Sequence, residues 1–227
     1  KSVSLRSYKP AFEGDSNAVN AAVTALLGAK RPVFYVGGGV VLADAEGPLR
    51  ELAKAANVPV TSTLMGLGAY PGSDDQSLGM LGMHGTYEAN MAMHDADLIF
   101  ALGARFDDRV TNNPSKFSPK ATIVHLDVDP ASVDKIIHSH ITLIGDAGWV
   151  LNALWETYQA RDAERGDDAR QKQQQHLEQW WQQINGWRSA PSQSQPAGSG
   201  RSEYFAPAGH SVAVPGNQGR RLCDVGC

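Results

Sequence analysis

Short apolar segments alternate with segments of helical periodicity over most of this chain, and this alternation limits the possible folds more than any other feature. The apolar segments are continuous rather than broken by alternating polar positions. Strands of a parallel sheet have this pattern because helices cover both of their faces. We therefore predict an α/β protein with a Rossmann-like, doubly wound parallel sheet. The predicted strands are residues 32–39, 58–63, 97–103, 121–129 and 140–146. The predicted helices are residues 15–30, 45–57, 85–96, 131–138 (one or two turns) and 147–160.

The predicted sheet domain spans residues 15–160, and segments of different composition flank it. Residues 1–14 are polar and predict a linker; because the chain starts at Lys1 rather than Met, we expect a piece of a longer protein. Residues 161–188 are charged and rich in Gln, and they predict a polar helical linker whose tryptophans need a surface to pack on. Residues 189–227 predict a flexible tail, so the chain ends in a helical and irregular extension.

The composition argues against several classes of protein. A net charge of −4 and an isoelectric point near 6.0 disfavour nucleic acid as the main partner, because such partners favour a clustered basic face. No apolar run approaches the roughly 20 residues of a membrane span, and the N-terminus has no apolar secretory segment. Cys223 and Cys227 both lie at the C-terminal end, which excludes a disulfide framework and a four-cysteine zinc site. We expect a cytoplasmic protein without a membrane partner.

Ligands of open α/β sheets bind outside the carboxyl ends of the strands, so the residues after each predicted strand are the candidate site residues. Gly37–Gly39 follow the first strand, where glycines let backbone amides approach a phosphate. A plain tight turn explains the same run, and the GxGxxG spacing is not met because Leu42 stands in the third glycine position. Ser62 and Thr63 follow the second strand and offer hydroxyl groups.

Charged residues follow the other three predicted strands. The third strand runs directly into Arg105, Phe106, Asp107, Asp108 and Arg109. Asp127 ends the fourth strand and Asp146 the fifth, where a Rossmann fold holds a ribose by its hydroxyls. A turn or a helix N-cap explains such aspartates equally well. Glycine, hydroxyl or carboxylate groups at five consecutive strand ends together predict a crevice that holds a nucleotide.

A glycine-rich loop before the third predicted helix contains Met80, Met83 and His84. Core packing explains the methionines best, and His84 fits a ligand or a base, although a single histidine is more often a structural hydrogen bonder. The chain has no G-x-S-x-G, H-E-x-x-H or Walker motif. No Cys or further His joins His138 and His140 at metal spacing. The nucleotide crevice is therefore the one well-formed site that the residues predict.

Six segments carry a resemblance to a known family. They are "PVFYVGGGV", "VPVTSTLMGLGAYP", "MLGMHGTYEAN", "LGARFDDRVT", "IVHLDVDP" and "LIGDA", in this order. They closely resemble the central domain of the acetohydroxyacid synthase (acetolactate synthase) large subunit. That family depends on thiamine diphosphate and joins two 2-oxoacids, with loss of CO₂, in branched-chain amino acid synthesis. The resemblance covers about residues 5–160, and "WWQQINGWR" continues it.

The resemblance implies that this domain binds FAD, which has no redox role in the family's main reaction. It assigns Asp108 and Arg109 to the side of a channel that leads to the active site and binds inhibitors. It reads His84 as a cofactor contact, and it assigns no catalytic residue and no metal ligand to this chain. The implied FAD contacts are Gly38, Thr63, Leu64, Leu81, Gly82, Met83, His84, Gly103, Ala104, Arg105, Phe106, Asp107, Asp127, Val128, Asp146 and Ala147.

The resemblance also implies two further domains and a cofactor-binding motif that this sequence does not contain. Thiamine diphosphate and Mg²⁺ belong to the family's other two domains, and no Gly-Asp-Gly motif occurs here. We therefore expect a fragment of the catalytic subunit that binds FAD and is inactive alone. In the intact enzyme we expect a homodimer or tetramer with a regulatory small subunit. The alternative is a stand-alone nucleotide-binding or regulatory module on the same fold. A third option is an NAD-dependent deacylase of related topology, but this sequence has no zinc-ligand cysteines to support it.

Overall fold

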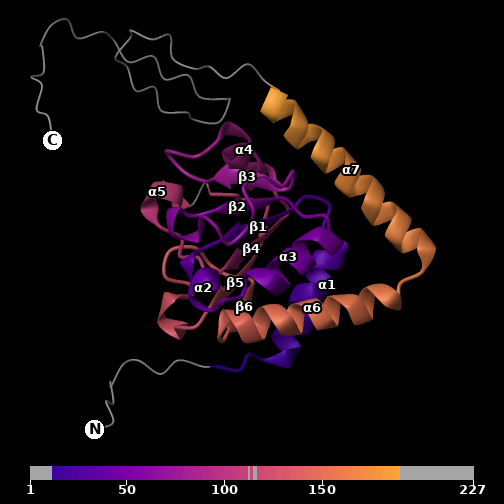
Figure 1. The fold of residues 1–227 in the computed structure, drawn as a ribbon, viewed down its shortest axis with the longest axis horizontal. Coiled ribbons are helices and arrows are strands. Elements are labelled where there is room, and N and C mark those ends of the chain that lie inside the picture. Colours follow the sequence, from indigo (N-terminus) through magenta and orange to yellow (C-terminus); the bar gives the residue numbers. More distant parts are fainter. Residues whose placement is uncertain (1–11, 112, 115–116, 190–227) are drawn as a thin grey trace, which may run out of the picture. The chain divides into compact units, whose positions relative to one another are not determined.

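The computed structural model describes residues 12–111, 113–114 and 117–189, and its centre is a six-stranded, fully parallel sheet (Figure 1). The strand order is β3-β2-β1-β4-β5-β6, which is the order of a doubly wound dinucleotide-binding fold. The predicted fold class is therefore confirmed. The strands are β1 (Pro32–Val36), β2 (Val60–Ser62), β3 (Ser77–Met80), β4 (Leu98–Leu102), β5 (Thr122–Asp127) and β6 (Ile141–Ile144).

The sequence did not predict strand β3. It is a four-residue strand at the edge of the sheet with only one fully buried position, so it lacks the continuous apolar run that marks the other strands. It also contains Gly79, whose φ of +78° lies in the left-handed region. The pairing of β2 with β3 also shifts register between Val60 and Ser62, so this edge of the sheet is irregular.

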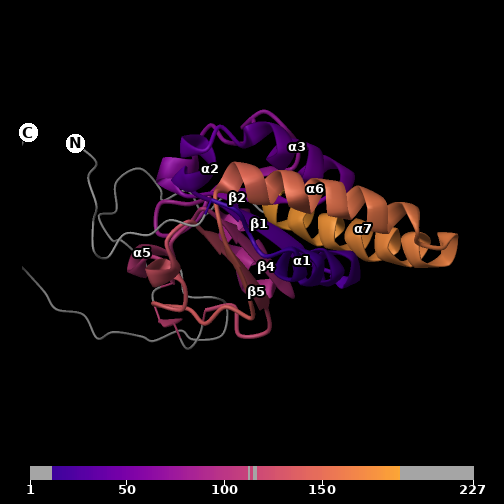
Figure 2. The same ribbon diagram turned by 90° about the horizontal axis from the view of Figure 1, so that it is seen from below.

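Helices on both faces of the sheet form two separate hydrophobic cores. Along β1, Phe34 and Val36 face the first core, whereas Val33 and Tyr35 face the second. The first core is closed by α1, α3 and α6, and α1 runs beside α6 (Figures 1 and 2). The second core is closed by α4 and α7. The described helices are α1 (Ser16–Gly28), α2 (Gly38–Leu42), α3 (Glu46–Ala55), α4 (Tyr87–Asp95), α5 (Asp108–Thr111), α6 (Ala147–Ala163) and α7 (Asp167–Ser189), with 3₁₀ turns η1 (Leu64–Gly66) and η3 (Pro130–Ser132).

Side-chain caps fix the starts of three helices. Asp15 accepts a hydrogen bond from the amide of Asn17 at α1, and Thr86 accepts one from Ala89 at α4. Asp146 accepts from two amides at the start of α6. The helical turns predicted for residues 131–138 are wrong beyond η3. Asp134 has a φ of +58°, and its carboxylate binds Ser139, so the chain turns there instead of continuing as a helix.

Helix α7 covers the second face of the sheet, although its polar composition predicts a linker. Trp180 is 1% exposed, and its indole donates to the carbonyl oxygen of Pro32 at 3.1 Å. Trp181 donates to the carbonyl oxygen of Asn57 at 3.0 Å. Arg188 donates to the carbonyl oxygens of Asp75 and Ser77. The tryptophans thus find the surface that the sequence requires at the starts of β1 and β2, and Arg188 holds the start of β3.

The described residues belong to one compact unit. The predicted flexible tail, Cys223, Cys227 and most of the N-terminal linker lie outside the described residues. Among the described segments, no helix combines the length and the apolar composition that crossing a membrane requires.

Candidate functional site

The ends of β1 and β4 meet at the centre of the sheet, where the strand order reverses. A Cβ atom on Gly37 would lie 2.2 Å from the carbonyl oxygen of Gly103, and one on Gly39 would lie 2.8 Å from its Cα. The amides of Gly37 and Gly39 donate to the carbonyl oxygens of Leu102 and Gly103. The amide of Gly38 has no acceptor among the described residues, so it is the one amide of this glycine run that is available to a ligand.

The end of β2 presents apolar side chains to solvent. The amide of Thr63 donates to the carbonyl oxygen of Val36, and its hydroxyl accepts from the amide of Gly66 at 3.0 Å. These bonds turn the chain into η1, which places Leu64 outside the core with 70% exposure. Met65 beside it is exposed as well. A flat apolar ring would cover such side chains.

The loop after β3 is held by one asparagine. The side chain of Asn90 accepts from the amide of Gly82 and donates to its carbonyl oxygen, at 3.2 and 3.1 Å. Leu81 is buried in the second core. Met83 is 63% exposed, and His84 is exposed beside it. Of these predicted contacts, Met83 and His84 are therefore the ones whose side chains are accessible.

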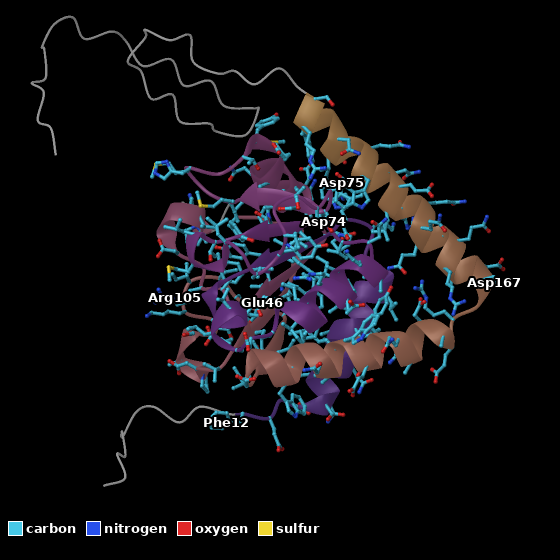
Figure 3. The ribbon with its side chains drawn as sticks, in the orientation of Figure 1. Phe12, Glu46, Asp74, Asp75, Arg105 and Asp167 are labelled. Atoms are coloured by element: carbon cyan, nitrogen blue, oxygen red, sulfur yellow. The ribbon has the colours of Figure 1, made fainter. Side chains whose placement is uncertain are left out.

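The loop after β4 alternates between buried and exposed residues. Gly103 begins it in the left-handed region, with a φ of +57°. Ala104 and Phe106 are buried, whereas Arg105 and Asp107 are exposed. The Arg105 side chain points away from the sheet (Figure 3). The ring of Phe106 packs between Tyr35 and His125, so it is not accessible to a ligand. The side chains of Asp108 and Arg109 lie outside the described residues.

The aspartates at the ends of β5 and β6 combine a structural role with a free oxygen. Asp127 accepts from the amide of Asp129 at 2.9 Å, and Asp146 accepts from the amides of Gly148 and Trp149. In each case the bonds use Oδ1, and Oδ2 has no hydrogen-bond donor among the described residues. Both aspartates are half-buried, as is Val128 after β5, while Ala147 is buried at the start of α6. The turn and N-cap explanations are thus correct for one oxygen of each carboxylate.

Two buried polar side chains lie under the β4 loop. Tyr35 and His125 flank Ala101 in the sheet register and are 0% and 1% exposed. His125 Nε2 lies 3.0 Å from the carbonyl oxygen of Ala104, and burial lowers the pKa of the ring. Burial, and then the charge of Asp107, raise the pKa of Tyr35 well above its usual range. Tyr35 Oη and His125 Nδ1 have no hydrogen-bond partner among the described residues.

A pocket of about 330 Å³ lies next to the strand ends, between the β2 and β3 ends and the start of α4. Sequence reasoning found Ser62 in its wall but gave no role to Tyr70, Thr86 and Glu88, which two separate segments contribute. Within the described ranges, no three His, Cys, Asp or Glu side chains gather as metal ligands. The strand ends therefore offer free amides, carboxylate oxygens and apolar side chains, which bind a nucleotide-like ligand better than they carry out acid–base chemistry.

Comparison with known proteins gives a consistent result for this chain. Residues 19–154 match the family model described as "Thiamine pyrophosphate enzyme, central domain". The chain is 48% identical over 189 residues to the acetolactate synthase isozyme 3 large subunit of Escherichia coli (strain K12), a match that covers 83% of this chain and 32% of that protein. It is 48% identical over 187 residues to the acetolactate synthase large subunit of Haemophilus influenzae, covering 82% of this chain and 31% of that protein. The chain thus spans about a third of the length of these relatives.

A solved structure shares the fold. It is the X-ray structure of a protein from Mycobacterium smegmatis described as a thiamin diphosphate-dependent enzyme. The TM-score is 0.55, and the match covers 68% of this chain and 30% of that one at 21% sequence identity. At this identity the likeness extends to the fold alone.

Proposed function

Because the chain belongs to the family of the thiamine pyrophosphate enzyme central domain, we propose that it is the FAD-binding central domain of an acetolactate synthase catalytic subunit. The family match confirms the resemblance that the strand-end motifs predict. The observation that carries the proposal is the set of unused polar groups at the carboxyl edge of the sheet. They are the amides of Gly38 and Arg105 and the Oδ2 atoms of Asp127 and Asp146.

These groups fit the parts of a dinucleotide. Amides of a strand-to-helix turn donate to phosphate oxygens. A carboxylate oxygen at a strand end accepts from ribose hydroxyls. The exposed Leu64 and Met83 offer an apolar surface to an isoalloxazine ring. The chemical classes of donors, acceptors and apolar contacts that FAD requires are therefore all present along one edge of the sheet.

In the proposed role this chain binds and orients, and the chemistry belongs to the cofactors. Thiamine diphosphate supplies the decarboxylation and the joining of two 2-oxoacids when it is bound in the whole enzyme. The described strand-end residues form no nucleophile–base pair, so we expect this domain to contribute no catalytic residue. The relatives are named as large subunits, and we therefore propose that the parent enzyme pairs with a regulatory small subunit and assembles as a homodimer or tetramer.

Titration of the purified chain with FAD tests the proposal. We expect flavin fluorescence to change on binding, and we expect Arg105→Ala to weaken the affinity by at least about twofold, because the exposed guanidinium lies at the phosphate-facing loop. Lys172→Ala is a matched control, since Lys172 is an exposed cation of α7, and α7 contacts Leu26, Pro32 and Asn57 at the opposite ends of the strands. The proposal fails if the folded chain gives no signal at high micromolar FAD.

A further inference from the structure

We propose that His125 is a positioning residue that holds the Ala104–Arg105 peptide so that the Arg105 amide faces the cofactor crevice as a donor to a diphosphate. This inference deepens the proposed FAD site and rests on it. His125 lies in the segment "IVHLDVDP", in the middle of the apolar run of β5, and the sequence alone predicts no role for it.

The His125 ring is fixed in the second core beneath the loop after β4. It is 1% exposed, and its Nε2 lies 3.0 Å from the carbonyl oxygen of Ala104 in the loop after β4. The ring meets Phe106 edge-on, with centroids 5.2 Å apart and planes at 74°. Phe106 in turn packs on Tyr35, so the loop is anchored from below by one ring on each side. A ring held in this way has little freedom to release the Ala104 carbonyl.

The hydrogen bond to Ala104 fixes which ring nitrogen of His125 carries the proton. A carbonyl oxygen can only accept, so Nε2 must carry the hydrogen. Burial lowers the pKa of His125, against the opposing influence of Asp127, the Ala104 carbonyl and Asp134, which are the charged and polar groups that face the ring. The ring is therefore neutral at pH 7, with its single N–H on Nε2. Nδ1 has no acceptor among the described residues that would favour the other tautomer.

The trans peptide between Ala104 and Arg105 sets the direction of the Arg105 N–H. The described chain has no cis peptide, so the Ala104 carbonyl and the Arg105 N–H point in opposite directions. The carbonyl points down to the buried histidine, and the N–H therefore points up and away from the core. Arg105 is exposed, and its N–H has no acceptor among the described residues. One hydrogen bond beneath the loop thus sets the direction of a donor above it.

A pair of variants separates positioning from packing. His125→Gln keeps an N–H donor that reaches the Ala104 carbonyl, and His125→Phe keeps the ring but removes the donor. We expect His125→Phe to weaken FAD binding about tenfold, equivalent to one well-placed hydrogen bond to a charged group. We expect His125→Gln to stay within about twofold of the wild type. His125→Asn is a control for the apolar ring of phenylalanine. Its side chain is polar but one methylene shorter than that of glutamine, so we expect it to miss the Ala104 carbonyl and to behave like His125→Phe.

Amide NMR of the full chain gives a readout that simple destabilisation would not move. We expect FAD to shift the Arg105 amide resonance in the wild type and in His125→Gln, and to leave it unshifted in His125→Phe and His125→Asn. If the wild type binds FAD and all three variants bind equally well, the positioning role is wrong and the proposed function stands. If all three variants weaken binding alike, the role of the donor is refuted. If the folded wild type does not bind FAD, both proposals fall together.

Discussion

The close approach of the β1 and β4 ends makes Gly37 the most sensitive position of the site. Its φ of −112° is open to any residue, so alanine there meets no backbone strain. The obstacle is space: the added Cβ would lie 2.2 Å from the Gly103 carbonyl oxygen and 2.5 Å from the Ala104 Cα. Both neighbours are backbone atoms. Restoring an ordinary contact of roughly 3.5 Å requires the two strand ends to separate by more than about 1 Å.

We expect Gly37→Ala to lower the free energy of unfolding by about 3 kcal/mol, at the upper end for overpacking because no side chain can rotate out of the way. Gly47→Ala is the matched control: it lies in α3, and a Cβ there meets nothing within 4 Å. That variant should gain up to about 1 kcal/mol. Urea unfolding followed by circular dichroism measures both. If Gly37→Ala remains within about 0.5 kcal/mol of the wild type, the inferred contact between the strand ends is wrong.

Two further variants test the packing of α7 through Trp180 and the raised pKa of Tyr158. Trp180→Phe removes the indole donor to the Pro32 carbonyl and should cost about 1–3 kcal/mol in urea unfolding, because it leaves a buried acceptor unpaired; a variant as stable as the wild type would show that the bond is not formed. Burial, and then Asp162, raise the pKa of Tyr158 to about 12 from 10.0. The unfolded chain therefore releases this proton first, so the stability due to Tyr158 is complete below pH 10 and is lost as the pH rises through about 12. Tyr158→Phe should show a smaller loss of urea midpoint between pH 9.5 and 11.5, and equal losses in both proteins would contradict the shift.

Much of the fold could be predicted because helices cover both faces of the sheet. Central strands such as β1 and β4 are buried at every position, and they appear in the sequence as continuous apolar runs. The edge strand β3 has no such run, so sequence reasoning missed it. Helix α7 was predicted as a helix, but its packing was not, because its core contacts rest on a few large residues within a polar, Gln-rich sequence. The tryptophans were the available signal.

For the candidate site, the sequence predicts the strand-end residues but not the buried side chains that support them. Strand-end positions such as Asp127 and Asp146 could be found by counting along the chain, because their places follow from the strands. His125 could not, since its partner Ala104 is 21 residues away and only the β4–β5 register brings them together. Phe106 was predicted as a cofactor contact, but its side chain has a structural role instead. It stands in a predicted cofactor loop, but its ring fills the core beside His125.

The contacts of α7 also set an order in which the chain can complete its fold during synthesis. The first core is composed of residues from Val19 to Tyr158, so all of it exists before α7 is made. The second core needs Trp180 and Ile184, and the Trp180 bond to Pro32 closes a separation of 148 residues. At roughly 5–20 residues per second on the ribosome, the α7 residues that complete the second core are made a few seconds after the first core. During that interval α4 already covers part of the second face, but the surface that Trp180 and Ile184 later fill is open to water, and a nascent chain at this stage exposes apolar surface that a chaperone can bind.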